Sequence, residues 1–163
     1  MDEANIAIRK HRDNMVVSGK WVIILGIWET FKILVLLLWE HRDYTYALIA
    51  EEDSDISMSL IKTVMTVMIF IFSSFILLIY IYIGRRSIRC GKGRKTGRLF
   101  LFFSFFIGII ELFEIPRYFI GDTSEISDTS IATFLIDLTG VFIIYQIIYS
   151  YICIQILEKK EKK

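Results

Sequence analysis

Two glutamates, Glu29 and Glu111, are the residues best placed to do chemistry, because each lies near the middle of a long apolar segment. A charge at the centre of an apolar span costs ~2.5–3.5 kcal/mol on insertion scales, so such a group normally faces other protein segments. Glu29 follows Gly26 by three residues, and Glu111 follows Gly108 by three. In a helix, each glycine and carboxylate would share a face that a second helix can approach closely. Such carboxylates can bind and release a proton or a cation.

The surroundings of the two glutamates match. Residues 26–33 read GIWETFKI and residues 108–115 read GIIELFEI, with five of the eight positions identical. Each stretch is followed by a Ser-acid-Ile-Ser sequence, at 54–57 and 124–127. The pattern predicts a duplicated helical hairpin, with parallel copies related by an axis along the membrane normal. Chance matching in a chain rich in Ile and Phe is the alternative interpretation.

Other polar side chains are expected at similar depth. Lys32 and Arg117 each lie three residues after a glutamate, Glu29 and Glu114, which predicts two ion pairs within helices. These groups are either transport ligands or structural partners, and interhelical hydrogen bonds in membranes average only ~0.6 kcal/mol. The residue types favour function for Glu29 and Glu111, and structure for Glu114 with Arg117. The predicted polar core consists of Glu29, Lys32, Ser73, Ser74, Glu111, Glu114, Asp137 and Gln146.

Four apolar segments, at residues 16–39, 61–84, 99–120 and 130–157, must position these side chains. Each is long enough to cross a hydrocarbon core of ~30 Å, which takes ~20 helical residues. Lipid offers no hydrogen bonds to the backbone, so spanning segments of this kind are helices. The chain is 55% hydrophobic with a mean hydropathy of +0.54, more apolar than ordinary soluble domains. The predicted fold is an all-α, polytopic membrane protein with four transmembrane helices in one domain over residues 1–163.

The distribution of charge predicts the orientation of these spans. Lys and Arg gather at both ends of the chain and in the connection 85–98, whereas the connections 40–60 and 121–129 are acidic. Short segments rich in Lys and Arg stay in the cytoplasm, so a multi-pass protein with both termini cytoplasmic is expected. The basic residues of the connection 85–98 are Arg85, Arg86, Arg89, Lys92, Arg94, Lys95 and Arg98.

The basic connection has two interpretations. It fixes the topology, and it also attracts anionic lipid head groups, at ~1 kcal/mol per basic residue near the surface. Its glycines, Gly84, Gly91, Gly93 and Gly97, predict a flexible segment. The Gly-Lys-Ser/Thr spacing of a phosphate-binding loop is absent, and no groove-reading module accompanies the charges, so no specific nucleic acid is expected.

No catalytic, metal or cofactor site emerges from the remaining residues. His11 and His41 would lie on opposite sides of the membrane, which disfavours haem or zinc within one subunit. Cys90 and Cys153 would both be cytoplasmic and reduced. An enzyme is therefore the least supported class.

Two functions stay open. One is a subunit for ion- or proton-linked transport or conduction through the intramembrane carboxylates. The other is a non-transporting membrane subunit with an assembly, regulatory or membrane-perturbing role. Four short helices bury little surface against one another, so self-association within the bilayer is expected with either function.

Overall fold

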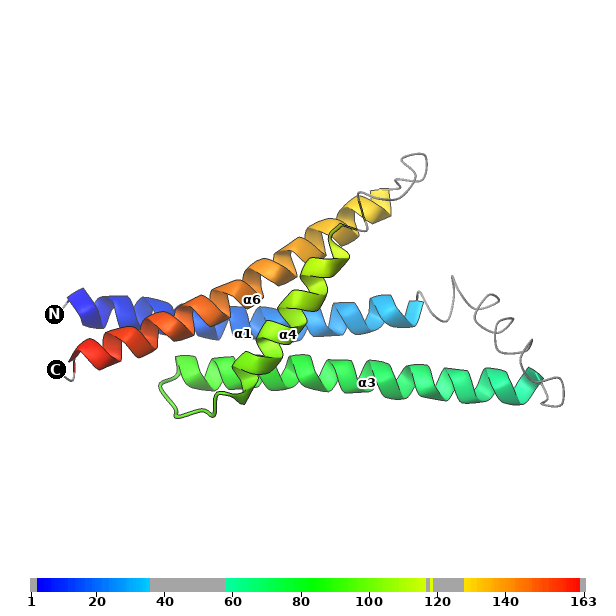
Figure 1. Cartoon of the computed structure of the whole chain (residues 1–163), viewed down its shortest axis with the longest axis horizontal. Coiled ribbons are helices and arrows are strands. Elements are labelled where there is room, and N and C mark those ends of the chain that lie inside the picture. Colours follow the sequence, from blue (N-terminus) through cyan, green and yellow to red (C-terminus); the bar gives the residue numbers. More distant parts are fainter. Residues whose placement is uncertain (1–2, 36–57, 117, 119–127, 162–163) are drawn as a thin grey trace. The chain divides into compact units, whose positions relative to one another are not determined.

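The computed structural model describes residues 3–35, 58–116, 118 and 128–161, and within them the fold is all-α without strands. The four helices are α1 (Glu3–Val35), α3 (Met58–Gly91), α4 (Leu99–Glu114) and α6 (Asp128–Glu161) (Figure 1). Two of them contain a stretch long and apolar enough to cross a membrane, Thr63–Gly91 and Thr133–Lys160. The all-α prediction is confirmed. The described residues of α1 and α4 contain no stretch of this length and apolar character.

The helices divide between two compact units. Unit 1 comprises Met1–Leu25 with Tyr80–Lys163, and unit 2 comprises Gly26–Ile79. The boundaries fall inside α1 and α3, so the predicted first copy of the hairpin, residues 16–84, contributes to both units. The duplication stays a prediction.

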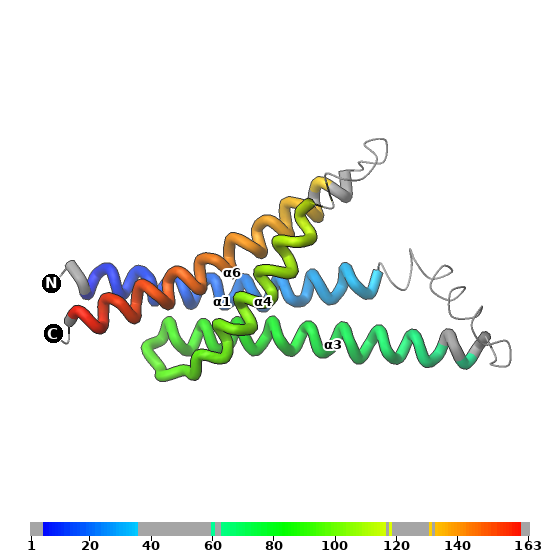
Figure 2. Tube along the Cα trace, in the orientation of Figure 1, coloured from blue at the N-terminus to red at the C-terminus, as the bar shows by residue number. Residues whose placement is uncertain are grey.

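Unit 1 is built from antiparallel neighbours. Helix α4 packs along α6, with Gly108 against Ile144 and with the rings of Phe100 and Tyr151 edge to face at 5.7 Å. At the far end of α6, Arg12 of α1 reaches Glu158. The start of α1, the end of α3, the start of α4 and the end of α6 therefore lie at one end of unit 1, here called the basic end (Figure 2).

Small residues bring α1 and α3 together at this end of unit 1. A Cβ atom added to Gly84 would lie 2.5 Å from the carbonyl oxygen of Gly19, and one added to Gly19 would lie 2.8 Å from that of Gly84. About one turn further along α3, the Ser87 hydroxyl donates a 2.8 Å hydrogen bond to the carbonyl of Met15. Glycines and serines that let helix backbones touch are typical of helix pairs in membranes. Gly84 thus serves close packing and not loop flexibility.

The basic connection is shorter than predicted, because α3 continues to Gly91 and includes Arg85, Arg86 and Arg89. Basic residues favour the carboxyl end of a helix, where they offset its dipole. The helix ends at Gly91, and two residues later comes Gly93, whose φ of 74° suits a residue without Cβ. Around it, the Arg94 amide donates to the Arg89 carbonyl at 3.1 Å and the Gly93 amide to the Cys90 carbonyl at 2.9 Å. This pair of bonds is a Schellman cap, and only residues 92–98 form the loop.

Two other helices also differ from the predicted spans. Helix α4 ends at Glu114 and not at residue 120, close to Pro116, which has no amide hydrogen to continue the helical hydrogen bonds. Ile115 itself keeps helical angles, with φ −53° and ψ −48°. Its 16 residues extend ~24 Å. Helix α1 begins at Glu3, well before residue 16, since the intervening Arg and Lys residues are good helix formers. Residues 36–39 and most of the two acidic connections lie outside the described residues.

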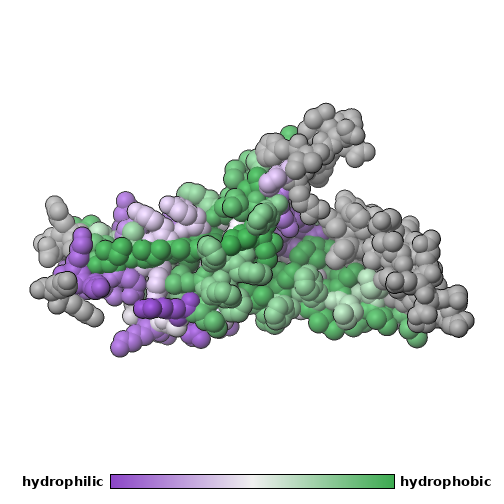
Figure 3. Space-filling view, in the orientation of Figure 1, coloured by the Kyte–Doolittle hydropathy of each residue, from purple (hydrophilic) through white to green (hydrophobic). Residues whose placement is uncertain are grey.

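The polarity of the surface is unusual for a compact protein. Many large apolar side chains are exposed, including Phe113 at 75% and Phe102 at 64%, while several polar side chains are buried. In Figure 3, hydrophilic residues gather at the basic end of unit 1 and apolar residues cover the helices beyond it. The buried polar residues are Ser18, Ser73, Ser87, Ser104, Glu111, Asp137 and Ser150.

Candidate functional site

The inward face of α6 carries a row of polar contacts within unit 1, here called the polar ladder. Its steps involve Asp137, Gly140, Gln146 and Glu158, which span 21 residues or ~32 Å of helix. Apolar side chains fill the intervals and give the face a helical period of three to four residues. The buried positions on α6 are Asp137, Gly140, Ile143, Ile144, Ile147, Ser150, Tyr151 and Ile154.

Glu111 is the most enclosed carboxylate of the ladder after Asp137, with 7% of its surface exposed. The phenol of Tyr80, from α3, donates a 2.8 Å hydrogen bond to its Oε1. Its Oε2 lies against α6, where a Cβ atom added to Gly140 would be 2.7 Å away. Three helices therefore define the position of one carboxyl group. A phenol can donate to a carboxylate and can also accept from a carboxylic acid, so this contact suits either protonation state.

The other steps of the ladder join α6 to its neighbours. At the end remote from the basic end, the Tyr118 hydroxyl donates to Asp137 Oδ2 at 2.5 Å. Beyond Glu111, the Ser18 hydroxyl donates to Gln146 Oε1 at 3.0 Å. At the basic end, Arg12 donates to Glu158 at 2.9 Å. The short bond to Asp137 has the length of a charge-assisted hydrogen bond.

Glu29, in unit 2, has a different setting. Lys32 Nζ lies 3.2 Å from Glu29 Oε2, as the spacing of the two residues predicts. The Glu29 side chain is 14% exposed and that of Lys32 is 20% exposed. A cation one turn away offsets the charge of this carboxylate, which agrees with the structural interpretation of the pair.

The eight residues of the predicted polar core divide between the two units. Glu111, Asp137 and Gln146 belong to the ladder of unit 1, where Glu114 is half-buried at the end of α4. Arg117, the predicted partner of Glu114, lies outside the described residues. Unit 2 holds Glu29, Lys32, Ser73 and Ser74.

The two serines of unit 2 differ in environment. Ser73 is 1% exposed, and its hydroxyl has no hydrogen-bond partner among the residues that the structure describes. Ser74, the next residue along α3, is exposed. Exposure makes Ser74 the weakest member of the predicted core.

The predicted lipid-binding residues also separate into groups. Arg85 and Arg89 are exposed on the last turns of α3, and the Arg86 guanidinium lies 5.4 Å from the centre of the Tyr82 ring. Lys92, Arg94, Lys95 and Arg98 are exposed on the loop 92–98.

Sequence reasoning did not assign Tyr80, Gly140, Ser18 or Tyr118 to the site. A glycine inside an apolar helix does signal a close approach, so Gly140 carried a usable signal. The partners of Glu111 and Gln146 come from helices 31 and 128 residues away in the chain, and helical period does not reveal such pairings.

The described residues contain no group of three His, Cys, Asp or Glu side chains that could hold a metal ion. Comparison of the chain with protein-family models, with curated proteins and with solved structures gave no match. The chemistry of the ladder is therefore the basis for any functional assignment.

Proposed function

We propose that this chain is a small integral membrane protein in which Glu111 exchanges a proton or a cation during ion- or proton-linked transport or conduction. The observation that carries the proposal is the enclosed Glu111 carboxyl group, held between the phenol of Tyr80 and the backbone at Gly140. Ionisable groups inside apolar helices are costly, and they mark ion and proton pathways.

The inverted polarity of the surface supports a membrane location. Large aromatic side chains are exposed on α4, whereas serines, Glu111 and Asp137 are buried. In lipid, this arrangement turns apolar side chains to the hydrocarbon and polar ones to other helices. Helices α3 and α6 have the length and composition of spans. With both termini cytoplasmic, the basic end of unit 1 would face the cytoplasm.

The spacing of the ladder supports a pathway along α6. Asp137, Gly140 and Gln146 follow one another at intervals of ~4.5 and ~9 Å along the helix, distances that a moving side chain or a water molecule can bridge. Each of these steps holds a hydroxyl group able to both donate and accept, from Tyr118, Tyr80 and Ser18. A proton or cation leaving Glu111 would meet polar atoms in both directions.

The basic end of unit 1 holds a barrier on this route. Two hollows open there and reach inward as far as Tyr151. Tyr151 lies 11 residues after Gly140 along α6, so it is ~16 Å nearer the basic end than the level of Glu111. Phe100, fully buried, packs edge-on against Tyr151 in this interval. In the proposed mechanism this aromatic pair moves to admit water.

Flux measurements on liposomes test the proposal. The full chain is reconstituted, and proton or monovalent-cation flux is followed under a gradient and an applied potential. Glu111→Gln keeps the shape and removes the titratable charge, so it abolishes flux, whereas Glu29→Gln, the matched control in the similar sequence, retains most of it. Wild-type liposomes without flux of protons or common monovalent ions contradict the proposal.

One observation favours the second function, a non-transporting membrane subunit. The outward side of α4 exposes Phe102, Phe105 and Phe113 at 61–75%, a surface that lipid or a second protein can cover. If the aromatic side chains of α4 bind a partner subunit, Phe102→Ala with Phe105→Ala lowers assembly while leaving flux at the wild-type level. Loss of flux in Glu111→Gln alone favours the first function.

A further inference from the structure

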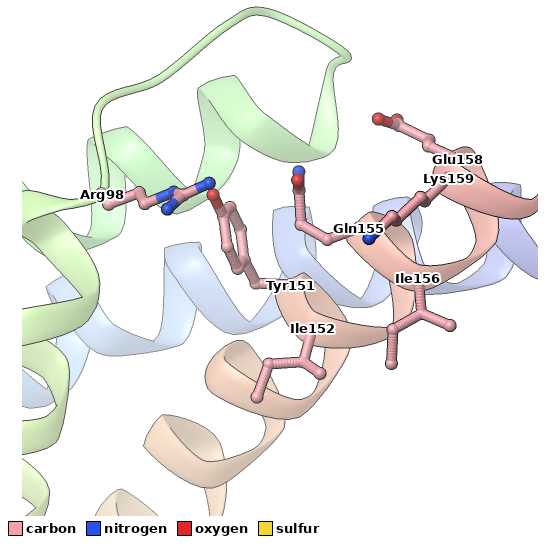
Figure 4. A pocket seen from close by; sticks show the side chains of 7 residues that line it. All are labelled: Arg98, Tyr151, Ile152, Gln155, Ile156, Glu158 and Lys159. Atoms are coloured by element: carbon pink, nitrogen blue, oxygen red, sulfur yellow. The ribbon is translucent and has the colours of Figure 1, made fainter. Parts of the chain in front are cut away.

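Two adjoining hollows lie at the basic end of unit 1, between the loop 92–98 and the end of α6. Their volumes are about 560 and 360 Å³, and both are lined by Arg98, Tyr151, Gln155 and Glu158. Figure 4 shows the Arg98 guanidinium beside Tyr151, with the side chain of Gln155 turned towards the same space. Four elements of unit 1, namely α1, the end of α3, the loop and α6, therefore close around one region, here called the basic hollow.

The basic hollow is strongly cationic. Among the described residues, Glu158 is the one acidic residue that lines it, and its carboxylate forms an ion pair with Arg12 at 2.9 Å. The Nε atom of Arg12 is buried and has no acceptor among the described residues. Guanidinium groups present a fork of donors that matches a phosphate group. The basic residues that line the hollow are Arg12, Arg94, Lys95, Arg98 and Lys159.

An exposed apolar stripe runs from this hollow along α6. Ile152 and Ile156 line the larger hollow, and they continue a row of aromatic side chains spaced by three and four residues. The side chains of the row are 49–62% exposed, and the rings of two of them stack at 6.0 Å. The row covers 14 residues, or ~21 Å, somewhat more than half of a ~30 Å hydrocarbon core. Its members are Phe142, Tyr145, Tyr149, Ile152 and Ile156.

We propose that the basic hollow is a discrete binding site for an anionic phospholipid. The phosphate group binds the guanidinium groups of Arg98 and Arg12, and an acyl chain lies along the stripe from Ile156 towards Phe142. Basic pockets between helices at the cytoplasmic side bind anionic head groups in this way. Inorganic phosphate shares the phosphate chemistry but leaves the stripe empty. The inference rests on the proposed membrane location, not on the exchange of ions at Glu111.

The ion pair between Arg12 and Glu158 gives the site a second property. The Glu158 carboxylate and a lipid phosphate would both bind the Arg12 guanidinium, so the two anions compete for it. Removing the carboxylate charge, as in Glu158→Gln, therefore strengthens lipid binding. Glu158→Gln would also strengthen a diffuse electrostatic attraction between the basic end and a membrane. The variants described below are therefore needed to separate a discrete site from diffuse attraction.

The experiment measures binding of lipid to the purified full chain in neutral detergent. The ligands are short-chain phosphatidylglycerol, phosphatidylcholine of the same chain length, and inorganic phosphate. We expect phosphatidylglycerol to bind best. Arg98→Gln weakens its binding roughly tenfold, the loss of one charge-assisted hydrogen bond. Arg9→Gln is the matched control, because it removes the same charge from an exposed residue near the start of α1 that does not line the hollow. We expect this control to bind like the wild type.

A second variant tests the stripe. Ile152→Ser weakens binding of phosphatidylglycerol and leaves binding of inorganic phosphate unchanged. Equal losses in Arg9→Gln and Arg98→Gln would overturn the proposal in favour of diffuse attraction. Equal affinities for inorganic phosphate and phosphatidylglycerol would show a free-phosphate site instead. Binding in detergent needs no flux, so failure here leaves the proposed role of Glu111 standing, and absence of flux leaves the lipid site standing.

Discussion

Residues 26–33 and 108–115 share five of eight amino acids, yet their glutamates have different contacts. Glu29 lies 3.2 Å from Lys32, one turn along its own helix. Glu111 accepts a hydrogen bond from Tyr80 on α3 and lies against Gly140 on α6. The position that holds Lys32 in the first stretch holds Glu114 in the second.

One local sequence pattern thus places a carboxylate in two chemical environments. An ion pair within a helix forms with the helix itself and offsets the cost of burying the charge. A carboxyl group held by a phenol and a glycine backbone depends on three helices, so its environment changes when they move. We therefore propose a structural role for Glu29 and an exchange role for Glu111.

The largest effect is expected when the cation is removed from the Glu29 pair. Lys32→Met leaves the poorly exposed carboxylate without this cation and should lower the free energy of unfolding in detergent by about 3–5 kcal/mol. Lys32→Arg, the control, keeps the charge and most of the stability. Reversible unfolding followed by circular dichroism measures both variants. A loss below about 1 kcal/mol, the range of exposed ion pairs, would remove the structural assignment of Glu29.

A smaller effect is expected at Gly140. Gly140→Ala places a methyl group 2.7 Å from Glu111 Oε2, too close for an unstrained contact, so the carboxylate is displaced at an overpacking cost of about 1–3 kcal/mol. Flux should fall with it, because the carboxyl group leaves the ladder. The control is Gly97→Ala, where an added Cβ meets nothing within 4 Å. Unchanged flux in Gly140→Ala would show that transport does not depend on the polar ladder.

The smallest effect on stability is expected at Tyr80. Tyr80→Phe removes the phenol that donates to Glu111 and should cost about 0.5–1.5 kcal/mol of stability, the net value of one hydrogen bond. Transport should change more than stability, since the substitution alters the group that exchanges. Tyr82→Phe keeps a ring against Phe103 and serves as the control. If Tyr80→Phe and Tyr82→Phe showed equally small losses of stability and of flux, the hydrogen bond from Tyr80 to Glu111 would have a structural role alone.

The sequence was sufficient to predict helices and to locate their apolar cores. Periodic apolar residues and internal charges placed Glu29, Glu111, Asp137 and Gln146 in the right elements, and the i, i+3 spacing predicted the contact of Lys32 with Glu29. Local patterns also explain the end of α4 near Pro116, although the predicted span overran it. The cap at Gly93 was misread as flexibility, because a helix stop and a loop share their glycines.

The tertiary partners of Glu111 were beyond prediction for a physical reason. The contacts of Tyr80 and Gly140 with Glu111 depend on the rotation and stagger of three helices, and many registers bury similar apolar area. Nothing in the spacing of residues 108–115 selects one register. The same holds for Ser18 with Gln146, and for Arg12 with Glu158.

Difference infrared spectroscopy of the protein in lipid vesicles tests most directly whether Glu111 exchanges and Glu29 does not. Spectra are recorded on changing pH and on adding a monovalent cation, for the wild type, Glu111→Gln and Glu29→Gln. We predict a change in a carboxyl band that disappears in Glu111→Gln and persists in Glu29→Gln. A band that persists in Glu111→Gln, or that disappears in Glu29→Gln, would contradict the account.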